Sequence, residues 1–187
     1  VRAYRRCLGS FGTGITIITA CAGDAHAGLT ANSFSSVSLD PPLILWSIDR
    51  KSTSLPIFRD ATAYAVNILS LHQQSLAGRF AKSAGDKFGD VEWKLGKQGA
   101  RIFPGVVAIL ECKPESVIEA GDHVVFLARV TEFSMSDKRP ILFVQGQYSQ
   151  AINHPEYVQN SNVSSLHLDG STNHRLLRRA YYRMSSA

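Results

Sequence analysis

The sequence of 187 residues lacks the features that mark several large classes of protein. No apolar run approaches the about 18 residues that a membrane-spanning helix needs, and the segment Val1 to Arg6 has neither the hydrophobic region nor the cleavage site of a secretory signal. The three cysteines, Cys7, Cys21 and Cys112, form no C-x-x-C pair, which argues against a disulfide framework and a thiolate zinc site. We therefore expect one soluble domain in the cytoplasm, with no membrane contact.

Motifs of the common enzyme classes are missing as well. The chain contains no G-x-G-x-x-G, no G-x-x-x-x-G-K-[ST], no G-x-S-x-G and no H-E-x-x-H. Its six histidines are scattered without the spacing of metal ligands. These absences argue against a Rossmann or P-loop domain and against the common hydrolases, and we expect no metal site.

Charge of one sign dominates only at the two ends of the chain. Lys and Arg number 20 against 15 Asp and Glu, which gives a formal charge of +5 and a pI near 9.3. Seven arginines lie in the end segments, and without them 13 basic residues face 15 acidic ones, so residues 7–174 carry a charge of −2. A nucleic-acid binder needs its basic residues clustered on a folded face. Nucleic acid is therefore not an expected partner, and a small nucleic-acid-binding barrel is a remote alternative. The seven arginines are Arg2, Arg5, Arg6, Arg175, Arg178, Arg179 and Arg183.

The hydrophobic pattern predicts many strands and few helices. β-Branched and alternating runs bounded by Gly, Pro and Asp are typical of strands joined by tight turns. With six or seven strands and no regular βαβ alternation, we predict a mainly β fold, a closed or partly closed antiparallel barrel with short helices. The expected strands include 15–21 and its hairpin partner after a turn near Asp24, then 43–48, 63–69, 106–119, 123–133 and 141–148; short helices are expected within 52–61 and 71–81, and a surface loop at 82–105.

The composition changes near the C-terminus. From Ser149 the chain is polar and rich in turn residues, and a short segment of helical composition, LLRRAYYRM, follows. We therefore predict a barrel domain over residues 1–149 and an extension over 150–187, made of a linker and the start of a helical region.

Two segments have the composition of an anion-binding site. TANSFSSVS (30–38) contains six hydroxyl or amide side chains in nine residues, and SIDRKSTS (47–54) contains four hydroxyls around Arg50 and Lys51. Hydroxyls, a Lys ammonium and free backbone N–H groups in a loop that enters a helix can bind a phosphate ester. Ser and Thr are also common at strand ends and helix caps, so this composition has a purely structural alternative.

Gly121-Asp122-His123 stands at the start of an expected strand. Hydride transfer between two heterocycles needs no acid–base triad, because the cofactors carry the chemistry and the protein orients them. One imidazole beside a shallow pocket would be enough for such a reaction. The structural alternative is that a single histidine in a turn is simply exposed to solvent.

Five segments together resemble the short-chain flavin reductase family, the reductase components of two-component flavin-dependent monooxygenases. They match in order and spacing over residues 4–149, and WSIDRKSTS and QYSQAINHP are most similar to reductases of 4-hydroxyphenylacetate-type aromatic hydroxylases. The resemblance implies an FMN-binding antiparallel split β-barrel, a homodimer, and an oxygenase as partner. The segments are GSFGTGITIIT (9–19), GLTANSFSSVSLDPPLILWSIDRKSTS (28–54), RFAKSAGDKFGDVEW (79–93), LECKPESVIEAGDHVVFLARV (110–130) and PILFVQGQYS (140–149).

The resemblance also implies roles for individual residues. It implies an NAD(P)H:flavin oxidoreductase. The flavin would be FMN or FAD and the hydride donor NADH or NADPH, and the sequence leaves both choices open. The alternative is a non-catalytic flavin-binding or electron-transfer barrel. Some relatives carry a C-terminal regulatory domain resembling MarR-type proteins, and composition does not decide whether residues 169–184 begin one. The implied site residues fall into three groups. The implied flavin contacts are Thr30, Ala31, Asn32, Ser33, Ser47, Ile48 and Asp49, and the implied phosphate contacts are Lys51, Ser52, Ser54 and Lys87. His123 is the implied catalytic residue beside the nicotinamide, and Tyr148 is implied to border the pocket.

Overall fold

The computed structural model describes residues 2–83 and 85–153. The chain divides into two units, Val1–Ala151 and Ile152–Ala187. The extension expected at 150–187 lies, from residue 154 onwards, outside the described residues. Within the described part of the chain, no helix combines the length and the apolar character needed to cross a membrane.

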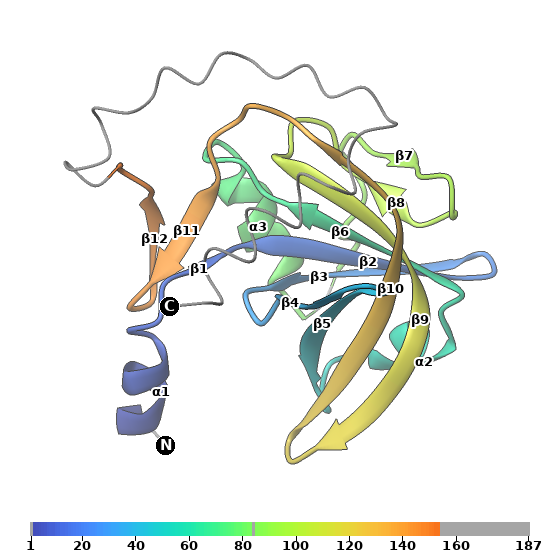
Figure 1. Cartoon of the computed structure of the whole chain (residues 1–187), viewed down its shortest axis with the longest axis horizontal. Helices are drawn as coiled ribbons and strands as arrows, with labels where there is room; N and C mark the ends of the chain where they lie inside the picture. Colours follow the sequence, from blue (N-terminus) through green and yellow to red (C-terminus); the bar gives the residue numbers. More distant parts are fainter. Residues whose placement is uncertain (1, 84, 154–187) are drawn as a thin grey trace. The chain divides into compact units, whose positions relative to one another are not determined.

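A seven-stranded antiparallel sheet forms the body of the first unit (Figure 1). Its strand order is β3-β2-β6-β9-β10-β5-β4, and its two edge strands follow one another in the chain. The sheet therefore curls into a partly closed barrel, and the predicted mainly β, antiparallel class is confirmed. The strands are β2 (Thr16–Ala22), β3 (Ala25–Ala31), β4 (Ser35–Leu39), β5 (Pro42–Asp49), β6 (Ala63–Ile68), β9 (Ala108–Ala120) and β10 (His123–Met135).

Two tight turns set the hairpins of this sheet. The β2–β3 hairpin turns at Gly23, whose φ is +60°, beside the predicted tip at Asp24. The long β9–β10 hairpin turns at Gly121, whose φ is +61°, so that His123 begins β10 as expected. Glycine suits both positions because it adopts positive φ without steric cost.

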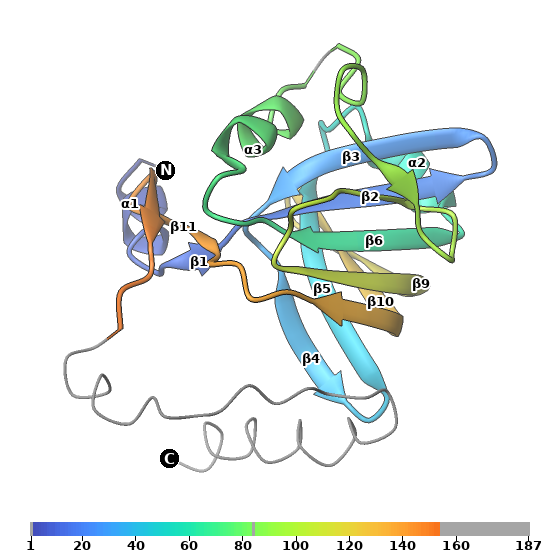
Figure 2. The same ribbon diagram turned by 90° about the horizontal axis from the view of Figure 1, so that it is seen from above.

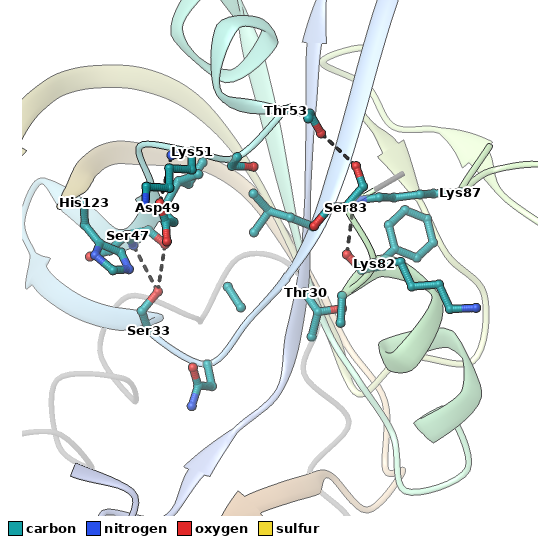
Figure 3. A pocket seen from close by; sticks show the side chains of 17 residues that line it. Thr30, Ser33, Ser47, Asp49, Lys51, Thr53, Lys82, Ser83, Lys87 and His123 are labelled. Atoms are coloured by element: carbon teal, nitrogen blue, oxygen red, sulfur yellow. Dashed lines mark hydrogen bonds between the residues drawn. The ribbon is translucent and has the colours of Figure 1, made fainter. Parts of the chain in front are cut away.

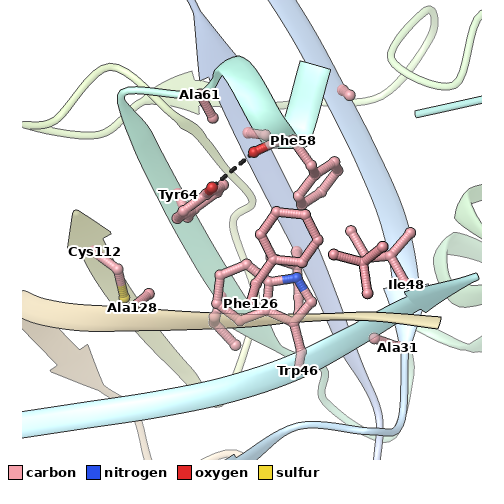
Figure 4. Packing of buried hydrophobic residues seen from close by; sticks show 14 of the residues in the cluster. Ala31, Trp46, Ile48, Phe58, Ala61, Tyr64, Cys112, Phe126 and Ala128 are labelled. Carbon is pink, nitrogen blue, oxygen red and sulfur yellow. Dashed lines mark hydrogen bonds between the residues drawn. The ribbon is translucent and has the colours of Figure 1, made fainter. Parts of the chain in front are cut away.

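Four aromatic side chains fill the barrel interior (Figure 4). Trp46 stacks on Phe126 with ring centroids 5.6 Å apart and meets the edge of Tyr64 at 4.9 Å. The Tyr64 hydroxyl donates a 2.7 Å hydrogen bond to the carbonyl of Phe58, and burial raises the pKa of Tyr64 to about 12. Buried aromatic pairs in such geometries add about 0.5–1.5 kcal/mol each beyond their burial, so this cluster is a major source of the barrel's stability.

A second, three-stranded sheet differs from the sequence-based expectation. The run 141–148, predicted as one strand, is a hairpin that turns at Gln145 and Gly146, with φ of +51° and +80°. Two successive positive φ values give the mirror-image turn that best fits a two-residue hairpin. The sheet contains β1 (Thr13–Gly14), β11 (Ile141–Val144) and β12 (Gln147–Gln150), in the order β1-β11-β12.

Helices and one small hairpin complete the described chain. The two predicted helices are present within their expected ranges, and both pack on β2 and β3 (Figure 2). The segment 82–105, expected to be entirely loop, contains a two-stranded hairpin, and the N-terminal helix was not anticipated because it has no buried face. These elements are α1 (Arg2–Leu8), α2 (Leu55–Asp60), α3 (Gln74–Phe80), β7 (Lys94–Leu95) and β8 (Arg101–Ile102).

Replacing Tyr64 with phenylalanine should lower the free energy of unfolding by about 1 kcal/mol, because the buried carbonyl of Phe58 loses its hydrogen bond. Urea denaturation followed by circular dichroism measures the change. Tyr148→Phe is the matched control, since that ring is 37% exposed. Equal stability of the Tyr64 variant and the wild type would contradict a stabilising role for this bond.

Candidate functional site

The candidate site is a pocket of about 600 Å³ at the open side of the barrel (Figure 3). It lies where β3 and β5 end, and Ser33 joins the two ends. The Ser33 hydroxyl donates to the carbonyl of Ser47 (3.2 Å) and accepts the N–H of the same residue (3.0 Å). One side chain thus engages both backbone groups of Ser47.

The loop after β5 forms one wall of the pocket. The side chain of Asp49 accepts the backbone N–H of Lys51 (2.8 Å), and its carbonyl accepts the N–H of Ser52 (2.9 Å). The Ser52 hydroxyl oxygen accepts the N–H of Ser54 (3.3 Å). These local bonds fix the loop before any ligand arrives, and they leave the Lys51 ammonium without an ion pair inside the described part of the chain.

The opposite wall comes from the end of α3 and the loop that follows it. The Thr53 hydroxyl donates to the carbonyl of Ser83 (2.9 Å), which ties the two walls together. Lys87 donates to the carbonyls of Gly28 (3.1 Å) and Phe80 (3.3 Å), and desolvation lowers its pKa. The ammonium expected to contact phosphate therefore holds this wall to the barrel instead, with one of its three N–H groups left for another acceptor.

Gly28 is required where this wall meets β3. A Cβ at this position would come within 2.6 Å of the Phe80 ring, far closer than real contacts allow. Phe80 in turn meets the edge of the Phe88 ring at 5.1 Å. The glycine thus lets an aromatic side chain pack directly on the strand backbone beside the pocket.

His123 lies at the rim and is joined to the loop after β5. It is paired with Asp49 in the β5–β10 register. Its Nδ1 lies 2.7 Å from Oδ1 of Asp122, a contact that an Nδ1–H donor satisfies because a carboxylate only accepts. This hydrogen bond holds the pKa of Asp122 below its usual value. The backbone N–H of Arg50 also donates to the carbonyl of Asp122 (3.0 Å), so the histidine turn and the loop are directly bonded.

Glu119 adds a second link between the same two segments. Its carboxylate pairs with Arg50 (2.7 Å) and with Arg59 of α2. These contacts lower the pKa of Glu119, and the hydrogen bond from Arg59 has the largest effect. The side chains of Glu119, Arg50 and Arg59 are about half exposed, so these ion pairs add little to stability. Their main effect is to fix the loop after β5 relative to the end of β9.

The structure brings together most of the residues singled out from the sequence. Two of them lie elsewhere: Ser54 is buried at the start of α2, and Tyr148 lies in the three-stranded sheet against Phe143. The lining also includes residues that sequence reasoning missed, mainly Thr53 and the wall segment 80–83. Both lie in segments already noted for their resemblance, which was the available signal. The predicted residues in the lining are Thr30, Ala31, Asn32, Ser33, Ser47, Ile48, Asp49, Lys51, Ser52, Lys87 and His123.

The donor set of the pocket fits an anionic heterocyclic ligand. Among the described lining residues, three lysines stand against a single carboxylate, that of Asp49, which is engaged by its own loop. The Ser52 hydroxyl keeps its proton free to donate, because its oxygen serves as an acceptor in the loop. Charge-assisted hydrogen bonds from such groups are those that phosphate esters form in proteins.

A family model described as a flavin reductase like domain matches residues 8–151. The chain belongs to the flavin reductase family. This confirms the resemblance seen in the five sequence segments and assigns the partly closed barrel to the split-barrel fold of these reductases.

Individual relatives agree with this assignment. The chain is 38% identical over 149 residues to the FMN reductase (NADH) SmoA of Agrobacterium fabrum, covering 80% of this chain and 85% of SmoA. It is 42% identical to a probable flavin reductase of Rhizobium meliloti, covering 79% of this chain but only 48% of that longer protein. A reductase subunit of a flavin-dependent monooxygenase, HsaB of Rhodococcus jostii, is 38% identical, with 79% and 76% covered.

Among solved structures, the NADH:FAD oxidoreductase SgcE6 of Streptomyces globisporus, in complex with NAD and FAD fragments, superposes with a TM-score of 0.76. It is 36% identical, and the match covers 80% of this chain and 91% of SgcE6. The fold similarity therefore extends over the whole described barrel. A partner specific for 4-hydroxyphenylacetate stays a prediction.

Proposed function

We propose that this chain is an NAD(P)H:flavin oxidoreductase that reduces FMN or FAD and passes the reduced flavin to a separate flavin-dependent oxygenase. The observation that carries the proposal is the pocket itself. It gathers a preformed anion-binding loop, the polar end of β3 and His123 around one cavity, in a chain of the flavin reductase family. Among the described residues, no group of three or more His, Cys, Asp or Glu side chains is placed to hold a metal ion.

The anion-binding loop would hold the flavin phosphate. Lys51 supplies a positive charge, and Ser52 supplies a hydroxyl donor at a position fixed by Asp49. Thr30 lines the pocket, and its hydroxyl is already engaged because it donates to the carbonyl of Ala77 (2.7 Å). The phosphate contacts position the ligand and take no part in the reaction.

Flavin and nicotinamide supply the redox chemistry when they are bound, a hydride passing from nicotinamide C4 to flavin N5. The protein's task is to hold the two ring systems face to face and to exclude water. His123 stands at the rim with its Nδ1 held by Asp122, which directs the remaining ring edge away from that carboxylate. We assign His123 to the nicotinamide side of the site.

The oxygenase partner is proposed from the relatives that are named reductase subunits of flavin-dependent monooxygenases, such as HsaB. An aromatic hydroxylase of the 4-hydroxyphenylacetate type is the specific partner we propose, in a cytoplasmic pathway of aromatic degradation. In this proposal residues 1–149 are the catalytic domain, and the extension contributes to regulation or docking.

A homodimer is the proposed assembly. None of the seven residues of α1 is buried, and a helix this short is not stable without packing partners. Leu8 and Phe11 are 56% and 77% exposed, and Val117 and Ile118, near the end of β9, are 41% and 54% exposed. A second copy that covers these side chains would bury the apolar surface.

Purified protein should oxidise NADH or NADPH in the presence of FMN or FAD, and should bleach the flavin under anaerobic conditions. Absorbance at the nicotinamide and flavin bands measures both changes. Failure to turn over either nicotinamide with either flavin would contradict the proposed activity. Retention of flavin through gel filtration in that case would support the non-catalytic binding module.

Two substitutions should separate the two halves of the site. Lys51→Ala should raise the KM for flavin by about tenfold to about a hundredfold with little change in kcat, because a charge-assisted contact worth about 1.5–3 kcal/mol is lost from a positioning group. His123→Ala should instead raise the KM for the nicotinamide. Lys113→Ala and His72→Ala, both on exposed positions outside the pocket, are the controls. Unchanged nicotinamide kinetics in the His123 variant would refute its assigned role.

Sedimentation equilibrium should give twice the chain mass of 20.4 kDa for the wild type. Leu8→Glu should shift the protein towards the monomer, since it places a charge in the proposed interface. Leu95→Glu, at a position of similar exposure on β7, should leave the mass unchanged. A monomeric wild type at micromolar concentration would rule out the dimer.

A further inference from the structure

A second cavity lies where β9 begins and β10 ends, beside the paired residues Ala108 and Met135. It has a volume of about 360 Å³ and shares no lining residue with the pocket of the candidate site. Its walls come from residues 92–94, 103–109 and 134–136. Proteins bind small molecules in concave, largely apolar spaces of this size. The proposed flavin reduction makes no use of it.

Two aromatic rings separate this cavity from the proposed flavin pocket. Phe103 lines the cavity, Phe80 lines the flavin pocket, and the two rings meet edge to face with their centroids 5.2 Å apart. Both side chains are buried in the same apolar cluster. The two spaces are therefore distinct, and each can be filled while the other is occupied.

Hydrogen bonds fix the lining segment 103–107 before any ligand arrives. The backbone N–H of Phe103 donates to the buried side chain of Asn67 (3.0 Å). From the other wall, the Ser136 hydroxyl donates to the carbonyl of Val106 (2.9 Å). The cavity is thus bounded by backbone that the barrel holds in place, and it requires no rearrangement to accept a ligand.

Apolar side chains form most of the cavity surface. Phe103 and Val106 are buried behind it, whereas Trp93 and Met135 are 37% and 71% exposed and present apolar surface to solvent. The guanidinium of Arg101 lies 3.9 Å from the centroid of the Trp93 ring, a cation–π contact that holds the indole at this wall. The cavity therefore offers a fixed apolar surface to a flat ligand.

Two lysines give the cavity its charge. Lys94 and Lys138 are both exposed, and neither forms an ion pair among the described residues. Glu92 is the single carboxylate among the described lining residues, so the lysines outnumber it. A lysine can lay its methylene stem along apolar surface while its ammonium stays in water. Apolar walls beside two unpaired ammonium groups match a ligand with a flat apolar body and a negative charge.

We propose that this cavity is a second small-molecule site, which binds an aromatic carboxylate. The ring system lies against Phe103 and Val106, and the carboxylate lies between Lys94 and Lys138. This site is separate from the flavin pocket, and the proposal does not depend on the reductase activity.

Naphthoate is the probe for this site, and isothermal titration calorimetry with the full chain measures its binding. One naphthoate should bind per chain, with the same Kd in the absence of flavin and at saturating FMN, because the two pockets are distinct. Naphthalenemethanol has the same ring system without the charge, so it should bind about tenfold more weakly.

Substitutions at exposed positions test where the probe lies. Ser134→Phe adds a ring to the cavity wall and should abolish naphthoate binding, whereas Ser116→Phe, exposed on β9 outside the lining, should bind it like the wild type. Replacing Lys94 and Lys138 together with alanine should raise the Kd for naphthoate about tenfold and leave that for naphthalenemethanol unchanged. Lys113→Ala is the control for the lysines, and urea denaturation checks that each variant folds.

Three results would overturn the proposal. The first is displacement of naphthoate by FMN, and the second is equally tight binding of naphthoate to Ser134→Phe and to the wild type. The third is a change in sedimentation mass for Ser134→Phe, which would assign the cavity to an interface between two copies of the chain. All three would leave the reductase activity in place, which is measured separately by turnover of NADH and flavin.

Discussion

The pairing register of β5 with β10 is the constraint on which the rest of the structure depends. It sets His123 opposite Asp49 and, in the same alternation, Trp46 opposite Phe126 in the core. Because side chains alternate across a strand, a shift of one residue would exchange the inner and outer faces of either strand. The aromatic core and the position of the candidate site are thus consequences of one register, and the packing energy of the core holds the geometry of the site in place.

The parts of the fold that could be predicted are those with a local signal. β10 alternates buried and partly exposed residues from Val124 to Ala128, and Gly121 marks its turn, so both could be read from the sequence. The turn at Gln145 and Gly146 has a weaker signal, because only one of its two positive φ values falls on a glycine. The helix α1 buries none of its residues, so it has no amphipathic pattern to detect.

The site was predictable to the same degree. Lys51 and Ser52 stand out because several hydroxyls and a lysine share one short loop. The wall formed by residues 80–83 depends on long-range contacts, such as the Thr53–Ser83 bond, which no periodicity records. Lys87 lines the pocket, but its two bonds to backbone carbonyls follow from the fold of the loop and not from its residue type. Tyr148 follows the barrel closely in sequence yet pairs in a different sheet.

The hydrogen bond from the N–H of Arg50 to the carbonyl of Asp122 joins the anion-binding loop to the histidine turn through main-chain atoms alone. This bond, unlike the ion pairs of Glu119, does not depend on which side chains the two residues carry. Mutations can exchange the side chains that line the pocket, and so alter which ligands are recognised, while this main-chain bond is retained. A scaffold with this property can diversify its ligands over evolutionary time without having to rebuild its reaction geometry.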